Sequence, residues 1–225
     1  MVIRGGTVVN AAEISKCDVG VKGGRIVALG ENLTAGAQEI DATGKYVMPG
    51  GIDSHCHIDQ RSSGGGRNSE TFESGTRSAA CGGTTTIICF AAQEKGELLT
   101  PVVEEYHDKA KQSCIDYSFH LIISDPSDEV MHEEVPKLIK AGHRSLKLFM
   151  TYPRNRLNDA EILRVLEVAK LNQALVCVHA ENHDAIMYMT EKLLAADKNS
   201  TRHHAWAKPP SVSYTHLTLP TTPYV

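Results

Sequence analysis

Two histidines flank a cysteine in the stretch GGIDSHCHIDQ, at residues 50–60, directly after a short apolar run. In a β-strand, residues two positions apart point to the same face, so His55 and His57 would lie side by side while Cys56 points the opposite way. Neutral imidazole is a common ligand of zinc and other transition metals. The pair therefore indicates a metal site, although paired histidines also occur in packing and surface roles.

A lysine has an unusual position in the stretch HRSLKLFM, where Lys147 stands between Leu146 and Leu148 in what reads as an interior strand. An unpaired ammonium is costly in an apolar interior. One interpretation is a strand-end lysine that reaches solvent or pairs with a carboxylate. The other is an amine whose pKa is lowered by burial and nearby cations. Such an amine can take up carbon dioxide and become a carbamate, whose two anionic oxygens can bridge two divalent ions.

Two further side chains follow predicted strands. His179 ends the apolar run ALVCV and is either another metal ligand or a core histidine with a backbone partner. Glu181 comes two residues later, and we expect it to support the site or the fold rather than to bind a metal. Tyr152, in the stretch FMTYP, is an ordinary loop tyrosine by itself. Beside a metal, its hydroxyl would be placed to stabilise an oxyanion.

An alternation of apolar strands and helices from about residue 50 onward must position these residues. This rhythm is typical of βαβ units and a parallel sheet. We expect five strands, at residues 51–57, 84–91, 117–124, 145–150 and 174–180. Each candidate ligand lies at or near the C-terminal end of a strand, where the active sites of βα-barrels are built. Five strands are too few for a closed barrel, but the pattern does not clearly favour a flavodoxin-like sheet either.

Residues typical of helix ends lie between these strands. Thr100-Pro101 predicts a helix with proline at its first position, and Gly142 predicts the end of another after VPKLIKA. Asn158 with Glu161 three residues later resembles a capping box.

The two ends of the chain differ from this pattern. Residues 1–48 read as a small β module of short strands, with a hairpin turn at Lys22–Arg25. Residues 49–210 then form the predicted α/β domain. Residues 211–225 contain no Asp, Glu, Lys or Arg where the rhythm calls for a helix. We interpret this last stretch as a non-native or disordered tail.

Composition narrows the class of partner. The chain has 225 residues, of which 41% are hydrophobic and 22% charged, with a net charge of −4. Its basic residues are scattered, so neither a nucleic acid nor an anionic membrane is expected as a partner, and a small molecule is favoured. No signal peptide or membrane span is recognisable, which predicts a cytoplasmic protein. The six cysteines include no CxxC pair and are expected to be reduced.

Four motifs in order carry a resemblance to a known family: MPGGIDSHCHIDQ, GGTTTIICFAAQ, GHRSLKLFMTYP and ALVCVHAENHDAI. Over residues 1–210 the chain resembles the dihydropyrimidinase and hydantoinase family of the amidohydrolase superfamily. The resemblance implies a partial (β/α)8 TIM-type barrel, with about five of the eight strands, and a β module that is half of a composite β-sandwich. It also implies two zinc ions. His55 and His57 would bind the first, His179 the second, and carboxylated Lys147 would bridge them, while Tyr152 matches the family's tyrosine.

The same resemblance implies a reaction. The chain also departs from the family's pattern at several points. Family members open a dihydropyrimidine or hydantoin ring to an N-carbamoyl amino acid, and relatives suggest a homotetramer. They also use a histidine on the sixth strand and an aspartate on the eighth, and neither strand is present here. We therefore expect an N-terminal fragment that is inactive alone. Cys89 stands where many relatives carry an aspartate, which bears on subfamily. Alternatives are an allantoinase or dihydroorotase activity, or a non-enzymatic dihydropyrimidinase-like scaffold.

Overall fold

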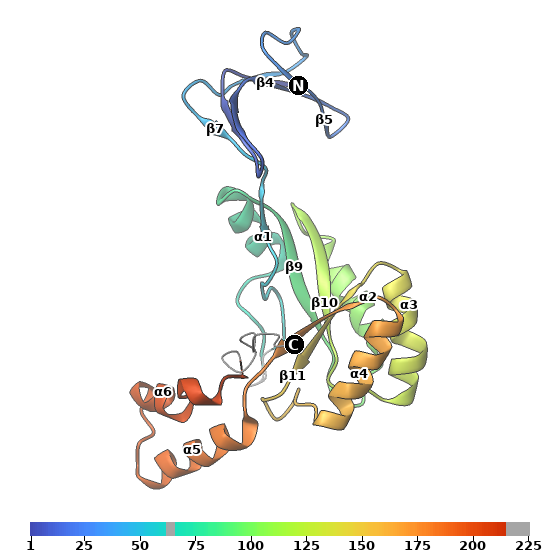
Figure 1. The fold of residues 1–225 in the computed structure, drawn as a ribbon, viewed down its shortest axis with the longest axis vertical. Coiled ribbons are helices and arrows are strands. Elements are labelled where there is room, and N and C mark those ends of the chain that lie inside the picture. Colours follow the sequence, from blue (N-terminus) through green and yellow to red (C-terminus); the bar gives the residue numbers. More distant parts are fainter. Residues whose placement is uncertain (62–65, 215–225) are drawn as a thin grey trace, which may run out of the picture. The chain divides into compact units, whose positions relative to one another are not determined.

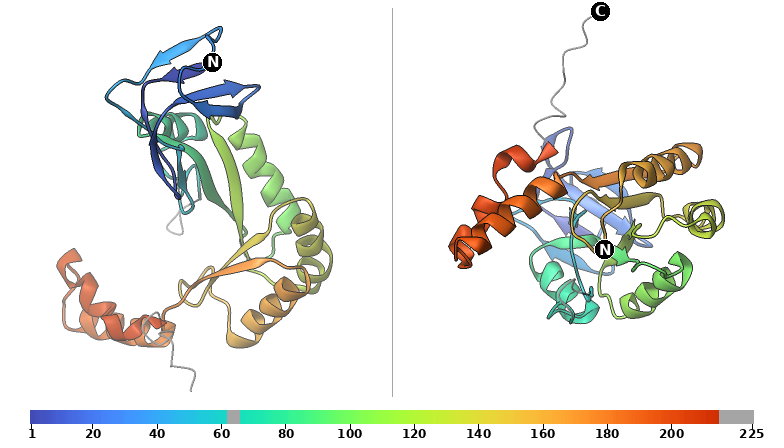
Figure 2. Two further views of the ribbon diagram at one scale, coloured as in Figure 1. Left: turned by 45° about the horizontal axis from the view of Figure 1, so that its top comes forward. Right: turned by 90° about the horizontal axis from the view of Figure 1, so that it is seen from below.

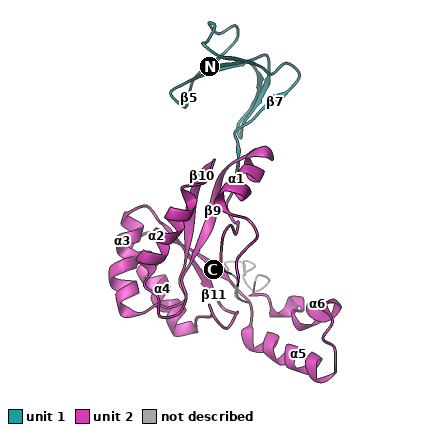
Figure 3. Ribbon diagram, turned by 180° about the vertical axis from the view of Figure 1, so that it is seen from behind, with its two compact units in different colours: residues 1–51 teal, residues 52–225 magenta. Residues whose placement is uncertain are grey.

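The computed structural model describes residues 1–61 and 66–214. The chain divides into two compact units, Met1–Gly51 and Ile52–Val225 (Figure 3). Most of the tail expected at residues 211–225 lies outside the described residues. Its first part, up to Tyr214, is described and ends with an N–H that donates to the carbonyl of Ala180.

The first unit contains two small sheets, with strand orders β5-β4-β1-β6 and β3-β2-β7. The strands are β1 (Val2–Arg4), β2 (Thr7–Val9), β3 (Ile14–Lys16), β4 (Asp18–Lys22), β5 (Arg25–Gly30), β6 (Glu39–Asp41) and β7 (Tyr46–Val47). Lys22 pairs with Arg25 across an antiparallel hairpin, as predicted. Gly23 and Gly24 both have positive φ, at 58° and 72°, which the tight turn requires and glycine adopts without strain.

The second unit is built on one five-stranded sheet with the order β12-β11-β10-β9-β8. Its strands are β8 (Gly51–Asp53), β9 (Thr84–Ala92), β10 (Asp116–Ile122), β11 (Ser145–Phe149) and β12 (Leu175–His179). The pairs β9–β10, β10–β11 and β11–β12 are parallel. Sequential strands are therefore spatial neighbours, as in a βα-barrel, and the predicted partial barrel with a separate β module is confirmed.

Helices α1 to α4 follow one another around the outside of this sheet, whereas α5 and α6 extend away from its β12 edge (Figures 1 and 2). They are α1 (Phe72–Cys81), α2 (Leu99–Ala110), α3 (Val135–Lys140), α4 (Asp159–Leu171), α5 (His183–Ala195) and α6 (His204–Ala207). A π-helical turn, Val130–Glu134, precedes α3, and short 3-10 turns lie at Thr201–His203 and Pro210–Val212. Within the described residues, none of these helices combines the length and apolar character that a bilayer crossing requires.

The helix-end predictions are partly confirmed. The Asn158–Glu161 capping box is present at the start of α4. Helix α2, however, begins at Leu99, two residues before Pro101. The reason is a long-range cap, because the buried carboxylate of Glu134 accepts hydrogen bonds from the N–H groups of Leu99 and Thr100, at 2.5 and 2.9 Å. Pro101 has no N–H and tolerates a place in the first turn.

Strand β8 is shorter than predicted, because it ends at Asp53 rather than at residue 57. Beyond Asp53, hydrogen bonds outside the strand ladder hold the chain in place. Nε2–H of His120 donates to the carbonyl of Ser54 at 2.8 Å, and the N–H of Cys56 donates to the carbonyl of Ile88 at 3.4 Å. The two histidines of the HxH motif therefore lie on a segment tied beside β9 instead of on a regular strand.

Candidate metal centre

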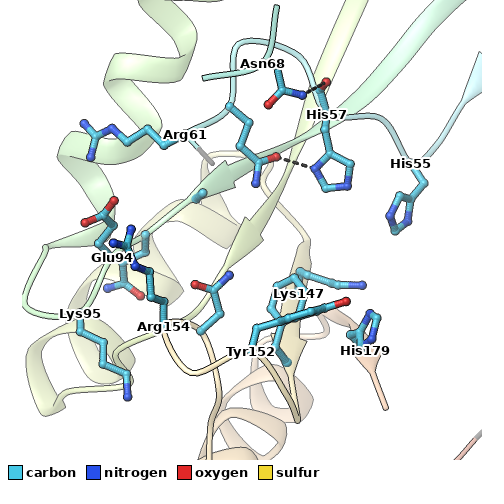
Figure 4. A pocket seen from close by; sticks show the side chains of 15 residues that line it. His55, His57, Arg61, Asn68, Glu94, Lys95, Lys147, Tyr152, Arg154 and His179 are labelled. Atoms are coloured by element: carbon cyan, nitrogen blue, oxygen red, sulfur yellow. Dashed lines mark hydrogen bonds between the residues drawn. The ribbon is translucent and has the colours of Figure 1, made fainter. Parts of the chain in front are cut away.

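A pocket of about 740 Å³ opens where the strands of the five-stranded sheet end. The five candidate metal-binding and catalytic residues from the sequence all line it: His55, His57, Lys147, Tyr152 and His179. They come from the segment after β8, from β11 and the loop that follows it, and from the last residue of β12. Figure 4 shows them around one cavity, with His55 and His57 on one side and Lys147, Tyr152 and His179 on the other.

The two histidines after β8 face each other edge to face, with ring centroids 5.4 Å apart. Both rings also contact the buried Phe90, each at 4.7 Å, and His57 stacks on it. Nδ1–H of His57 donates to Oε1 of Gln60 at 2.5 Å. Since one ring nitrogen is occupied in this way, Nε2 is the nitrogen of His57 that is free to bind a metal.

Lys147 is the most enclosed of the candidates, with 6% of its surface exposed. Its Nζ lies 5.7 Å from the ring centre of Phe90 and 5.1 Å from that of Phe149. Burial lowers the pKa of Lys147. Burial also lowers the pKa of His55, followed by the charge on Lys147. Among the described residues no carboxylate pairs with this amine. The snorkelling or ion-paired lysine considered from the sequence is therefore not what the structure places here.

His179 is oriented by the loop that follows β12. Its Nε2–H donates to Oε2 of Glu181 at 2.6 Å, and the same oxygen accepts from Nζ of Lys208 at 3.1 Å. Burial opposes ionisation of Glu181, but these two hydrogen bonds prevail and lower its pKa. An ionised carboxylate holding one nitrogen of a histidine leaves the other, Nδ1, as the candidate ligand atom.

Tyr152 has a left-handed backbone, with φ of 67°, in the loop after β11. Its carbonyl accepts the N–H groups of Asn155 and Arg156, at 2.9 and 2.8 Å, which fixes this turn. The ring lies 5.0 Å from that of His179, and the hydroxyl lies 3.5 Å from Nζ of Lys208. A tyrosine held in a strained conformation at the edge of a pocket is consistent with a functional role.

The side chains of the pocket differ from a complete metal-binding site in one respect. Across residues 1–61 and 66–214, no three His, Cys, Asp or Glu side chains come close enough together to hold one ion. The donor chemistry nevertheless fits a divalent metal, because three imidazoles share the pocket with an amine that has no carboxylate counter-ion among the described residues. A carbamate on Lys147 would add the anionic oxygens that this group of side chains lacks.

Several residues of the pocket are not marked individually by any sequence pattern. Gln60, Asn68, Arg154 and Lys208 either line it or hold its members, and Asn68 donates to the carbonyl of His57 at 2.9 Å. Each reaches the site through a loop conformation or across a long sequence separation, so no local pattern marks it. Glu181 was noted because it lies two residues after His179, and the structure gives it the supporting contact expected there.

Comparison with known proteins shows the family to which the chain belongs. The chain belongs to the Amidohydrolase family, whose sequence model matches residues 46–219. Its relatives include D-hydantoinases. The chain is 46% identical to the D-hydantoinase of Geobacillus stearothermophilus and 41% identical to that of Ralstonia pickettii, over 93% and 94% of its length.

Solved structures of a D-hydantoinase and a dihydropyrimidinase are also similar to this chain. A D-hydantoinase structure with 41% sequence identity superimposes over 94% of this chain, with a TM-score of 0.91. The dihydropyrimidinase of Brevibacillus agri, also 41% identical, gives a TM-score of 0.89 over 94% of the chain. The chain covers only 45–46% of the curated relatives and 46% of each of these structures, so it spans about half of their length.

Proposed function

We propose that this chain supplies one part of the active site of a metal-dependent cyclic amidohydrolase. The reaction is the opening of a dihydropyrimidine or hydantoin ring to an N-carbamoyl amino acid. The observation that carries the proposal is the buried amine of Lys147, which shares a pocket with His55, His57 and His179 and has no carboxylate partner within residues 1–61 and 66–214. The D-hydantoinase relatives support the choice of reaction.

Two zinc ions are the cofactors of this proposal. His55 and His57 would hold one ion and His179 the other, with Lys147 bridging them as the N6-carboxylated side chain. Zinc bound here would polarise the ring carbonyl and lower the pKa of water toward neutrality. Burial favours the carbamate on Lys147, because the neutral amine is the form that adds to carbon dioxide.

The remaining side chains position these groups. Gln60 and Glu181 each hold one nitrogen of a histidine, which fixes the ring and its tautomer. The hydroxyl of Tyr152 would donate to the oxygen of the carbonyl under attack, where negative charge develops. One such donor is worth roughly 3–4 kcal/mol in the transition state. Lys208, 3.5 Å from that hydroxyl, adds positive charge on the same side.

We further propose that activity needs segments outside these 225 residues. A histidine from a sixth strand and an aspartate from an eighth would complete the ligands and move the proton to the leaving ring nitrogen. The 225-residue chain alone is therefore expected to be inactive. We place the full-length protein in the cytoplasm as a homotetramer.

The test is ring opening by a full-length version of the chain, extended to the length of the D-hydantoinases. Hydrolysis of dihydrouracil or hydantoin is expected, with Lys147→Ala reducing it to background and Tyr152→Phe lowering kcat about 10²–10³-fold. Tyr188→Phe is the matched control, because that tyrosine lies on α5 outside the pocket and is 58% exposed. Turnover of allantoin or dihydroorotate alone would reassign the substrate, and no turnover of any cyclic amide would contradict the enzyme proposal.

A further inference from the structure

Two thiols meet directly behind the candidate metal centre. Sγ of Cys56 lies 3.3 Å from Sγ of Cys89. Cys56 stands between His55 and His57 but does not line the pocket, because its side chain packs against the main hydrophobic cluster. Cys89 lies within β9 and is completely buried. The same short segment therefore presents two imidazoles to the pocket and one thiol to a neighbouring strand.

The other four cysteines have no comparable contact with a second thiol in the described part of the chain. Cys17, Cys114 and Cys177 have hydroxyl groups as their sulfur contacts, and Cys81 is exposed. Within the described part of the chain, Cys56 and Cys89 form the sole thiol pair at hydrogen-bond distance. They are 33 residues apart in the sequence, so the fold brings them together.

We propose that Cys56 and Cys89 are a redox modification site, at which a reversible disulfide ties the HxH segment to β9. A disulfide needs a sulfur–sulfur distance of about 2.05 Å, so the two atoms have to approach by roughly 1.3 Å. Cys89 is fixed within a regular, buried strand, whereas Cys56 is half-buried on irregular backbone. Most of the movement therefore falls on Cys56.

The oxidant is a peroxide, and the step balances in two stages. The sulfur of the half-buried Cys56 attacks the peroxide O–O bond, forming an S–O bond, and the released oxygen leaves as water with the thiol proton. The sulfur of Cys89 then attacks the Cys56 sulfenic acid, so that the S–S bond forms and a second water leaves. Two electrons pass from the two sulfurs to the peroxide.

The expected consequence concerns the two adjacent histidines, and this part rests on the proposed function. The N–H of Cys56 is 3.4 Å from the carbonyl of Ile88, longer than the usual hydrogen-bond range of about 2.7–3.2 Å. A disulfide would draw this loosely held segment toward β9. Metal ligands tolerate displacements of only about 0.2 Å, so we expect oxidation to weaken zinc binding. Bound zinc would in turn disfavour the disulfide, because such coupling is reciprocal.

The test of the disulfide uses the 225-residue chain carrying Cys81→Ser, treated with hydrogen peroxide and digested with trypsin without reduction. The substitution is needed because Cys81 and Cys89 lie between the same two cleavage sites, Arg77 and Lys95. The expected product is a crosslink between peptides 46–61 and 78–95, with loss of two hydrogens and reversal by dithiothreitol. Cys114, which is exposed, reports that the oxidant acted.

Two variants distinguish the proposed chemistry from the effect of a misfolded protein. In Cys89→Ser the crosslink is impossible, and Cys56 should be trapped by dimedone as the sulfenic acid; in Cys56→Ala both products should be lost. Cys177→Ser is the matched control and should leave the crosslink unchanged. Circular dichroism checks that each variant folds.

The proposal is overturned if Cys114 is oxidised while Cys56 and Cys89 remain free thiols. A crosslink in a full-length protein that binds no zinc would refute the proposed function and leave the disulfide standing. Zinc binding that is equal in the oxidised and reduced full-length protein would refute the coupling between the disulfide and the metal.

Discussion

The middle and the two edges of the five-stranded sheet differ in how they are held. In the middle, β9, β10 and β11 carry side chains such as Phe119, Leu121 and Leu146 that are at most 1% exposed. At the edges, Ile52 of β8 is 67% exposed, and Leu175 and Val178 of β12 are 63% and 40% exposed. The middle is fixed by apolar packing, whereas the edges depend on backbone pairing and a few polar contacts.

The candidate metal centre draws on both regions. Lys147 comes from the packed middle, where its strand neighbours Leu146 and Leu148 are completely buried. The three histidines come from the edges, and hydrogen bonds to Gln60 and Glu181 orient two of them. The lysine is therefore positioned by the folding of the sheet itself, whereas the histidines are positioned by local contacts that can change without unfolding the protein.

The largest expected difference in stability is between substituting a leucine in a middle strand and substituting one in an edge strand. Leu146→Ala removes a fully buried side chain and should lower the free energy of unfolding by about 2–5 kcal/mol. Leu175→Ala, on the neighbouring strand, should cost less than about 1 kcal/mol because that side chain is mostly exposed. Urea unfolding followed by circular dichroism measures both. Equal losses would show that the edge is packed as firmly as the middle.

A polar contact at the start of α2, a helix that packs on the middle strand β9, should have the next largest effect. Glu134→Ala removes the carboxylate that accepts the N–H groups of Leu99 and Thr100 at the start of α2. Leaving these donors without a partner should lower the free energy of unfolding by about 1–3 kcal/mol. The adjacent Glu133→Ala, at an exposed position, should change it by less than about 0.5 kcal/mol. A similar loss in both variants would rule out the capping role.

Acid should weaken the fold through a histidine pair on the helical side of the sheet. Nε2 of His107 and Nε2 of His143 are 3.3 Å apart, and burial, followed by the charge of His107, lowers the pKa of His143 below 6.5. The unfolded chain therefore takes up a proton more readily, so this contribution to stability is present above pH 6.5 and is lost as the pH falls. The slope from one such group is at most about 1.4 kcal/mol per pH unit.

Urea unfolding between pH 7.5 and 5 measures this dependence. His143→Gln should reduce the slope, and His204→Gln, at an exposed position, should leave it unchanged. Some slope should remain in His143→Gln, because burial also lowers the pKa of His55. An unchanged slope in His143→Gln would contradict the assignment.

The smallest effect on stability is expected from a substitution beside the edge strand β12. The same substitution should nevertheless weaken metal binding at the site. Glu181→Gln keeps the shape of the side chain beside His179 but removes its charge. We expect less than about 1 kcal/mol of lost stability, but about 10–100-fold weaker zinc binding in the full-length protein. Isothermal titration with zinc measures the affinity. Unaltered affinity would mean that Glu181 does not orient a ligand.

Much of the sheet was predictable because its signals are local. Apolar runs such as TTTIICFA and ALVCV mark buried strands, and the C-terminal ends of parallel strands meet at one edge. These two facts were enough to place His179 and Lys147 at one pocket. The Asn158 cap was predictable for the same reason, because Glu161 lies only three residues away.

The remainder depends on contacts between distant parts of the chain. Nothing near Leu99 in the sequence reveals that Glu134 caps α2, so the helix start was misplaced at Pro101. The early end of β8 is set in part by bonds from His120 to Ser54 and from Cys56 to Ile88, which strand periodicity does not encode. The contact between Cys56 and Cys89 likewise arises only when β9 lies beside the HxH segment.

The proposed function depends most on Lys147 being a carboxylated metal ligand. Native mass spectrometry of the full-length protein tests this directly, because it counts bound zinc and detects the added carbon dioxide together. We predict two zinc ions and one carboxylated lysine per chain, with the modification absent and the zinc pair lost in Lys147→Ala. Full zinc occupancy in Lys147→Ala, or a wild-type chain with neither zinc nor the modification, would contradict the account.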